Sequence, residues 1–281
     1  MTTGSSPVAG SRCGFVAVVG APNAGKSTLV NRMLGEERMI TGPEAGITRD
    51  SISLNWEWNG RAVRLVDTAG LRKRAKVEDK LERLSAADTK RAIDYAEIVV
   101  LLLDATRGLE AQDLKIASQV IEEGRGLIIA LNKWDVAENA SSLFNGVKAA
   151  LTEGLAQLRD VPLLTVSAIT GKGIDTVLQV AFDLREQWTR RVPTGELNRW
   201  FADAVDANPP PAPKGQLIKL RYITQVTSRP PTFVVFGNRT DELPESYRRY
   251  LLNAMRRDLK LGPVPLRLDF RGRTNPFDKN R

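Results

Sequence analysis

Residues 15–190 alternate short apolar runs with stretches of helical period. The apolar runs predict six strands, which are Phe15–Gly20, Ser51–Trp58, Ala62–Val66, Ile98–Asp104, Leu127–Asn132 and Leu163–Val166. Apolar residues at helical spacing predict the helices Lys26–Leu34, Ala86–Ala96, Gln112–Glu123, Ser141–Leu158 and Ile174–Arg190. Strands that alternate with helices form a mostly parallel sheet covered by helices on both faces. We therefore expect an α/β domain over residues 15–190, after a flexible Gly-, Ser-, Thr- and Pro-rich lead over residues 1–14.

A different order of elements follows Pro193. A helical stretch that runs to about Val205 cannot continue through the prolines at positions 209, 210, 211 and 213. Beyond them, the pattern predicts the strands Gln216–Thr224, Thr232–Phe236 and Pro265–Phe270 and a basic amphipathic helix, Glu245–Leu259. This order indicates a small α+β domain over residues 191–281, with helices on one face of a three-stranded sheet.

A glycine-rich string joins the first predicted strand to the first predicted helix. It consists of Gly20, Ala21, Pro22, Asn23, Ala24, Gly25, Lys26 and Ser27, and Thr28 follows it. This is the pattern of a phosphate-binding loop (P-loop), in which glycines allow a tight turn whose N–H groups point at phosphate oxygens. The helix N-terminus and Lys26 add positive charge, and the Ser27 hydroxyl is a candidate ligand of Mg²⁺.

Polar residues at the ends of two later strands indicate which nucleotide binds. One group follows the fifth strand and the other ends the sixth: Asn132, Lys133, Trp134 and Asp135, then Ser167 and Ala168. The Asp135 carboxylate can accept hydrogen bonds from both N1–H and the 2-amino group of guanine, whereas adenine has no such pair of donors. A backbone N–H of the second group can reach the guanine O6. The sequence therefore predicts a guanine nucleotide.

Two further segments are candidates for contact with the γ-phosphate. The third strand is followed by Asp67, Thr68, Ala69, Gly70 and Leu71. This order places Asp67 near the metal and leaves the Gly70 N–H for the γ-phosphate. Thr48, in a segment of weak periodicity, is the candidate second hydroxyl ligand of Mg²⁺, and such segments order around the γ-phosphate and relax after hydrolysis. We expect Lys26, Thr48, Asp67 and Gly70 to carry the catalysis.

Composition and charge narrow the class of protein. The 281-residue sequence contains one cysteine, Cys13, which excludes an internal disulfide and a multi-cysteine metal site. It contains no histidine, which excludes Ser–His and Cys–His catalysis and histidine-ligated metals. The net charge is +8, and residues 190–281 contain 18 Lys and Arg against 9 Asp and Glu, a net +9. This asymmetry favours a polyanionic partner, with a solvated basic surface as the alternative. Without a membrane-length apolar run or an export signal, we expect a cytoplasmic protein with no membrane contact.

These residues together resemble the EngA (Der) family of Era-like GTPases, from about Gly14 to the C-terminus. The second domain carries part of the resemblance, because two of its segments look like the family's KH-like domain: Pro230, Pro231, Thr232 and Phe233, and then Pro244, Glu245, Ser246 and Tyr247. The family has two tandem GTPase domains before the KH-like domain, so this chain resembles the second of them together with the KH-like domain. Leu71 stands where many GTPases have a water-orienting glutamine, and the Era-like group shares this replacement of the glutamine. Ile47 stands where the family usually has threonine.

The residues indicate a Mg²⁺-dependent GTPase, and without the equivalent of an arginine finger we expect slow intrinsic turnover. The resemblance implies that it switches conformation during assembly of the large ribosomal subunit. It implies rRNA as the partner, and we expect no DNA specificity and a monomeric state. It also implies that Asn23 helps to hold K⁺ against the phosphates, whereas a loop-stabilising side chain is the alternative. Two other functions remain open, namely an RNA-binding module that binds GTP but barely hydrolyses it, and an ATP-dependent kinase.

The second predicted domain lacks the Gly-x-x-Gly loop that clamps a nucleic-acid backbone in ordinary KH modules. Its basic helix instead offers candidates for contact with rRNA phosphates, which are Arg248, Arg249, Arg256, Arg257 and Lys260. We expect the apolar side of this helix to be core, and it consists of Tyr247, Tyr250, Leu251 and Met255. Arg72, Lys73 and Arg74 are a further candidate RNA contact, with a solvated loop as the alternative.

Overall fold

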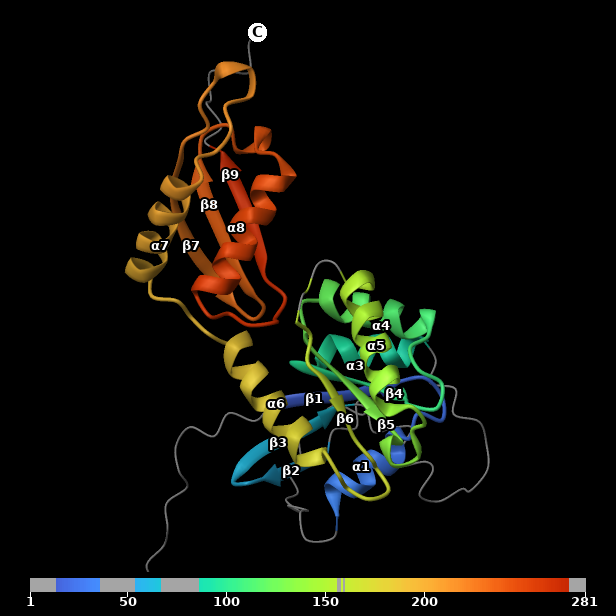
Figure 1. Cartoon of the computed structure of the whole chain (residues 1–281). Coiled ribbons are helices and arrows are strands. Elements are labelled where there is room, and N and C mark those ends of the chain that lie inside the picture. Colours follow the sequence, from blue (N-terminus) through green and yellow to red (C-terminus); the bar gives the residue numbers. More distant parts are fainter. Residues whose placement is uncertain (1–13, 36–53, 67–85, 156–157, 159, 273–281) are drawn as a thin grey trace, which may run out of the picture. The chain divides into compact units, whose positions relative to one another are not determined.

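The computed structural model describes residues 14–35, 54–66, 86–155, 158 and 160–272, in two compact units that divide between Arg185 and Glu186. Among these residues, the first unit contains a six-stranded sheet in the order β2-β3-β1-β4-β5-β6 (Figure 1). Its strands are β1 (Gly14–Gly20), β2 (Leu54–Trp58), β3 (Arg61–Val66), β4 (Ile98–Asp104), β5 (Gly126–Asn132) and β6 (Leu163–Thr165). The β2–β3 pair is antiparallel and the other neighbouring pairs are parallel, which confirms the predicted mostly parallel sheet.

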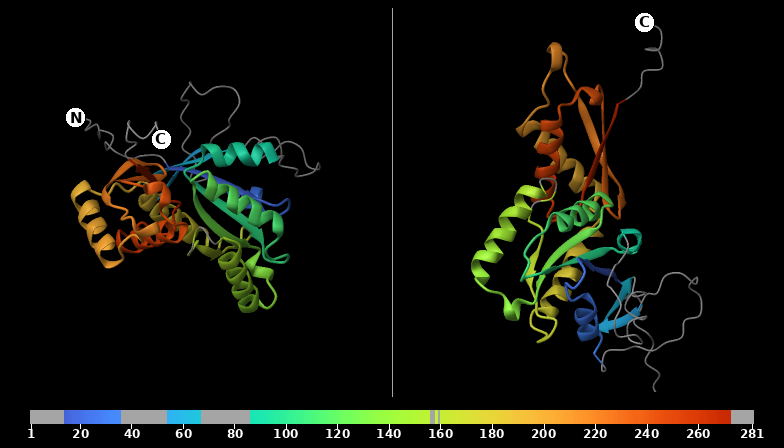
Figure 2. Two further views of the ribbon diagram at one scale, coloured as in Figure 1. Left: turned by 90° about the horizontal axis from the view of Figure 1, so that it is seen from above. Right: turned by 90° about the vertical axis from the view of Figure 1, so that its right-hand side faces the viewer.

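Helices cover both faces of this sheet, and the central strands β4 and β5 are therefore buried along their whole length. The helices are α1 (Lys26–Leu34), α3 (Ala86–Tyr95), α4 (Ala111–Glu122), α5 (Ala140–Gly154) and α6 (Ile174–Trp188). Successive strand residues point to opposite faces. Leu101 of β4 belongs to one core cluster with residues of α3, α4 and α5, whereas Ile98 and Leu184 of α6 both lie next to Gly126 on the other face. Figure 2 gives two further views of these layers. The α/β fold class is confirmed.

The second unit has the predicted order of helix, two strands, helix and strand. Its elements are α7 (Thr194–Ala207), β7 (Leu220–Ser228), β8 (Pro231–Gly237), α8 (Glu245–Asp258) and β9 (Arg267–Gly272). The sheet has the order β7-β8-β9, with β7 antiparallel and β9 parallel to β8. One cluster joins Phe201 of α7, Phe233 of β8 and Leu251 of α8, so both helices pack on the same face of the sheet. As expected, Tyr247 and Met255 are buried in it and Tyr250 packs against it.

The predicted position of β7 is wrong by four residues, because Gln216–Thr224 was expected and Leu220–Ser228 is observed. The strand starts later because Pro213–Gly215 form a 3₁₀ turn before it. It continues through Gln225, whose buried amide accepts a hydrogen bond from the Val192 N–H (2.8 Å) and donates one to the Arg190 carbonyl (2.9 Å). From the sequence alone, a buried glutamine whose amide is hydrogen-bonded cannot be distinguished from a polar residue at the end of a strand.

The predicted end of α5 is also wrong, since the helix stops at Gly154 rather than at Leu158. A Cβ atom at Gly154 would press on Leu114 of α4, so glycine allows the two helices to approach closely there. Leu155 and Leu158 lie beyond the helix but remain 1% and 2% exposed in the same core cluster. The spacing of apolar residues thus continues past the end of the helix, because this spacing indicates which residues are buried and not which backbone conformation they have.

Candidate functional site

The turn from β1 into α1 has the close backbone approaches that its glycines imply. Gly25, the N-cap of α1, has a φ of 86°, a left-handed conformation that favours glycine. A Cβ atom there would collide with the Asn132 amide, and one at Gly20 would collide with the Leu102 carbonyl of β4. Both glycines therefore let the turn lie directly against neighbouring strands.

Lys26 folds back over this turn although it opens helix α1. Its side chain is buried, at 6% exposure, and its Nζ donates hydrogen bonds to the carbonyls of Gly20 (3.0 Å) and Ala21 (2.6 Å). The next hydroxyl, Ser27 Oγ, is buried and makes no hydrogen bond within the described part of the chain. A buried polar atom without a partner is costly, so its presence at this point of the loop suggests a ligand for it.

Asn132 ties together three loops at the carboxyl edge of the sheet. It is 1% exposed at the end of β5. Its Nδ2 donates to the Ala24 carbonyl in the loop after β1 (2.8 Å), and its Oδ1 accepts from the Ala168 N–H in the loop after β6 (2.9 Å). The structure therefore brings together the phosphate-loop and base-recognition motifs that the sequence places more than a hundred residues apart.

The residues after Asn132 form a short turn that presents Asp135 to solvent. Lys133 has a left-handed backbone (φ 60°), and Trp134–Val136 form a 3₁₀ turn held by the Trp134 N–H on the Val166 carbonyl (3.1 Å). The Trp134 ring packs edge-on against Phe144 of α5. Asp135 is exposed, as a carboxylate that receives an incoming ligand must be.

Hydrogen bonds hold the loop after β6 beside the Asn132 amide. Ser167 is 2% exposed, and its N–H, carbonyl and hydroxyl bind Lys172, Gly171 and Thr170 respectively within the loop. Arg32 of α1 donates to the Thr170 carbonyl (3.2 Å), so this loop is also tied to the helix that follows the phosphate loop.

Sequence reasoning missed Asp104, the last residue of β4, which the structure adds to this edge. Its Oδ2 accepts from Lys133 Nζ (2.6 Å), and its Oδ1 accepts from the N–H (2.9 Å) and hydroxyl (2.7 Å) of Thr106. Burial alone would raise the pKa of the Asp104 carboxyl, but the hydrogen bonds from Lys133 and Thr106 outweigh it and hold this pKa below its ordinary value. A signal was available, because Asp104 ends an apolar strand beside the strand that ends in Asn132.

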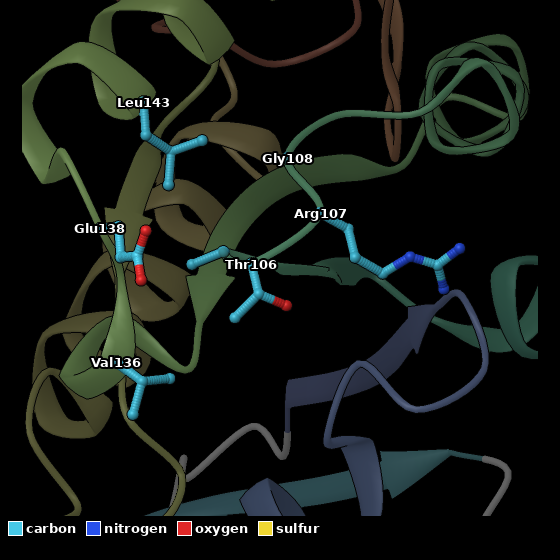
Figure 3. A pocket seen from close by; sticks show the side chains of 7 residues that line it. Thr106, Arg107, Gly108, Val136, Glu138 and Leu143 are labelled. Atoms are coloured by element: carbon cyan, nitrogen blue, oxygen red, sulfur yellow. The ribbon is translucent and has the colours of Figure 1, made fainter.

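A hollow of about 420 Å³ lies between the loops that follow β4 and β5 (Figure 3). Its wall includes Thr106, Arg107 and Gly108 from one loop and Val136 and Glu138 from the other. Neither Asp104 nor Lys133 is among the residues that line this hollow.

Several predicted site residues lie outside the described residues, namely Thr48, Asp67, Thr68, Ala69, Gly70 and Leu71, as do Arg72, Lys73 and Arg74. Within the described ranges, His, Cys, Asp and Glu form no group of three or more that could hold a metal ion. A buried Ser27 hydroxyl without a hydrogen bond nevertheless fits Mg²⁺, which binds few protein oxygens and keeps its remaining contacts for phosphates and water. Asn23, the candidate K⁺ residue, is exposed and has a left-handed backbone (φ 63°).

In the second unit, two of the candidate RNA-binding arginines hold the fold. Arg248 donates to the carbonyls of Leu243 (3.2 Å) and Thr240 (2.8 Å) and lies over the Phe270 ring. Arg256 donates to two carbonyls in the turn after α8. Arg257 binds Asp258 but remains exposed, as do Arg249 and Lys260.

Comparison with known proteins matches both units to families. Residues 15–133 match a family model described as 50S ribosome-binding GTPase, and residues 191–271 match one described as KH-domain-like of EngA bacterial GTPase enzymes, C-terminal. The GTPase Der of Novosphingobium aromaticivorans is 64% identical over 94% of this chain, and that of Parvibaculum lavamentivorans is 54% identical over 93%. The chain is a relative of the EngA (Der) GTPases. It spans 59% and 55% of the length of these two relatives.

A solved structure of Era, in complex with MgGDPNP and a segment of 16S ribosomal RNA, is also similar. It is 21% identical, covers 93% of each chain and superposes with a TM-score of 0.45. No helix in the described part of this Der relative combines the length and the apolar character that crossing a membrane requires.

Proposed function

We propose that this chain binds GTP with Mg²⁺ and hydrolyses it slowly to GDP and phosphate, as a conformational switch in assembly of the large ribosomal subunit. The observation that carries the proposal is the Asn132 amide, which bridges the phosphate loop at Ala24 and the loop at Ala168. An ordinary strand end needs no such bridge. A site that binds the phosphates and the purine of one nucleotide needs the two loops at a fixed position relative to each other.

Each residue of the site has a role in this proposal. The N-terminal amides of α1 and the Lys26 ammonium bind the phosphates, and the Asp135 carboxylate accepts the paired donors of guanine. Gly70 donates its N–H to the γ-phosphate, and Ser27, Thr48 and Asp67 would hold Mg²⁺. When bound, the ion neutralises charge that develops on the phosphate oxygens. Leu71 has no group that orients water, which accounts for a slow intrinsic rate.

The ribosomal part of the proposal rests on the family matches and on charge. The C-terminal unit falls in the basic part of the chain, and Arg249, Arg257 and Lys260 are exposed on and beside α8. Polyanionic rRNA is a fitting partner for such a surface. We propose that the protein acts as a cytoplasmic monomer, with GTPase and KH-like domains over residues 15–190 and 191–281.

Phosphate release from GTP tests the enzymatic part. Wild-type protein with Mg²⁺ should release phosphate, and K⁺ in place of Na⁺ should accelerate the release if Asn23 holds a cation against the phosphates. Binding of GTP without release would instead favour an RNA-binding module with an idle pocket. Preference for ATP in an equilibrium competition would favour a kinase and refute the role of Asp135.

Co-sedimentation with purified ribosomal subunits tests the partner. The protein should pellet with the large subunit more strongly with a non-hydrolysable GTP analogue than with GDP, and less strongly as salt rises. Binding that is indifferent to both nucleotide and salt would refute the switch.

A further inference from the structure

Asp104 occupies the end of β4 directly opposite Asn132, the last residue of β5. It is 8% exposed, and it lies outside the nucleotide motifs that the sequence identifies. Removing a charge from water costs free energy unless the charge is paired, so the burial of this carboxylate beside the proposed ligand site calls for an explanation.

The Asp104 carboxylate is held in one orientation by its own loop. The Thr106 N–H and hydroxyl both donate to Oδ1, at 2.9 and 2.7 Å. The N–H groups of Arg107 (3.0 Å) and Gly108 (2.9 Å) donate to the Asp104 backbone carbonyl, which closes a tight turn after the strand. Figure 3 shows Thr106, Arg107 and Gly108 in the wall of the hollow beside this turn. These hydrogen bonds restrict the orientation of the Asp104 carboxylate and hence the position of its Oδ2.

Oδ2 binds the Lys133 ammonium at 2.6 Å, and the Lys133 side chain is 34% exposed. A lysine side chain has many rotamers in water, and fixing its tip restricts the methylene stem between the tip and the backbone. Here the stem starts between Asn132, which joins the loops, and Asp135, the residue proposed to select guanine. In the proposed function, the pair therefore fixes the tip of a side chain that begins beside the residues expected to contact the purine.

We propose that Asp104 is a positioning residue for guanine nucleotide binding, because it anchors the Lys133 ammonium and thereby presents the Lys133 stem to the purine ring. This inference rests on the proposed function. A Lys133 ammonium released from Asp104 would also become an alternative partner for the Asp135 carboxylate. Loss of Asp104 should therefore weaken nucleotide binding mainly by faster dissociation.

The test is a double-mutant cycle on GDP affinity, with the dissociation rate of a fluorescent GDP analogue as second readout. Asp104→Asn keeps an oxygen for Thr106 but removes the charge, and it should raise the GDP dissociation constant about tenfold. In a Lys133→Met background, which keeps an unbranched stem, Asp104→Asn should change the constant less than about twofold. A merely structural role would give the same loss in both backgrounds and would overturn the proposal.

Glu97 provides a matched control at the opposite end of the same strand. It is 7% exposed, directly precedes β4 and pairs with Arg185. Glu97→Gln should lower thermal stability and leave GDP affinity unchanged. Wild-type protein that binds no GDP would overturn the proposed function and this inference together. Wild-type binding with an unchanged constant for Asp104→Asn would overturn the positioning role alone.

Discussion

Replacing Asn132 with alanine should both destabilise the first unit and weaken nucleotide binding. The substitution leaves two buried backbone groups without partners, the Ala24 carbonyl and the Ala168 N–H, which now bond to the amide at 2.8 and 2.9 Å. A buried group that loses its partner costs roughly 1–3 kcal/mol, so the free energy of unfolding should fall by about 2–6 kcal/mol. This loss is smaller than the stability of a domain over most of the typical range of roughly 5–15 kcal/mol, so the variant should still fold.

The assay must separate the two units, since a chain with two units need not unfold in one step. Hydrogen exchange of β4 and β5 peptides at increasing urea concentration reports the first unit, and exchange of β8 peptides reports the second. The GDP dissociation constant is measured in parallel. Asn132→Ala should speed exchange in the first unit alone and raise the GDP constant at least about tenfold, because the phosphate loop loses its tie to β5.

Asn198 gives a matched control in the second unit. This asparagine joins α7 to β7, since its Nδ2 donates to the Ile223 carbonyl and its Oδ1 accepts from the Ile223 N–H, both at 3.0 Å. Asn198→Ala should speed exchange in the second unit and leave GDP affinity unchanged. If Asn132→Ala alters neither stability nor affinity, or if both alanine variants weaken GDP equally, the bridge does not organise the site.

Three further predictions follow from single side chains. Asp135→Asn should shift preference from guanine toward xanthine nucleotides in a competition assay, and unchanged GTP affinity would contradict its role. Replacing Arg249 and Lys260 together with alanine should weaken co-sedimentation with ribosomal subunits and flatten its salt dependence, whereas Arg248→Ala should instead lower the stability of the second unit. Burial raises the pKa of Asp113, so its ionised form costs stability. As pH rises past the ordinary range of aspartate, urea unfolding should show wild-type losing stability relative to Asp113→Asn, and a pH-independent difference would contradict this.

The bounds of the fully buried strand β4 were predictable from the sequence, whereas those of β7 were not. The residues of β4 from Ile98 to Leu103 are all apolar, and a short run of this kind predicts a buried strand. The predicted bounds of β4 agree with those observed. The end of strand β7 was misplaced because the strand continues past Thr224 through Gln225, whose amide bonds to the Val192 N–H and the Arg190 carbonyl, backbone groups more than thirty residues away. Hydrophobic period contains no information about such partners.

The same division applies to the candidate site. The phosphate loop and the Asn132–Asp135 segment were recognisable because their chemistry depends on residue type at fixed local spacing. Asp104 was not recognised, because its role depends on a neighbouring strand that places it next to Lys133. In the second unit the basic residues of α8 looked equivalent in sequence, yet Arg248 binds two backbone carbonyls whereas Arg249 is exposed.

Strand β4 carries a buried carboxylate at each end, and this arrangement is not explained by stability alone. Buried ion pairs are often no more stabilising than well-packed apolar residues in the same place. Glu97 accepts from the Phe15 N–H (3.3 Å) as well as from Arg185, so at the start of the strand the pair fixes β1 against β4. At the other end, the partners of the Asp104 carboxylate among the described residues are Thr106 of its own loop and Lys133. The two pairs thus have different roles, because the Glu97–Arg185 pair fixes β1 against β4 and the Asp104–Lys133 pair fixes a loop at the proposed ligand site. Nucleotide affinity should therefore depend on the Asp104–Lys133 pair and not on the Glu97–Arg185 pair.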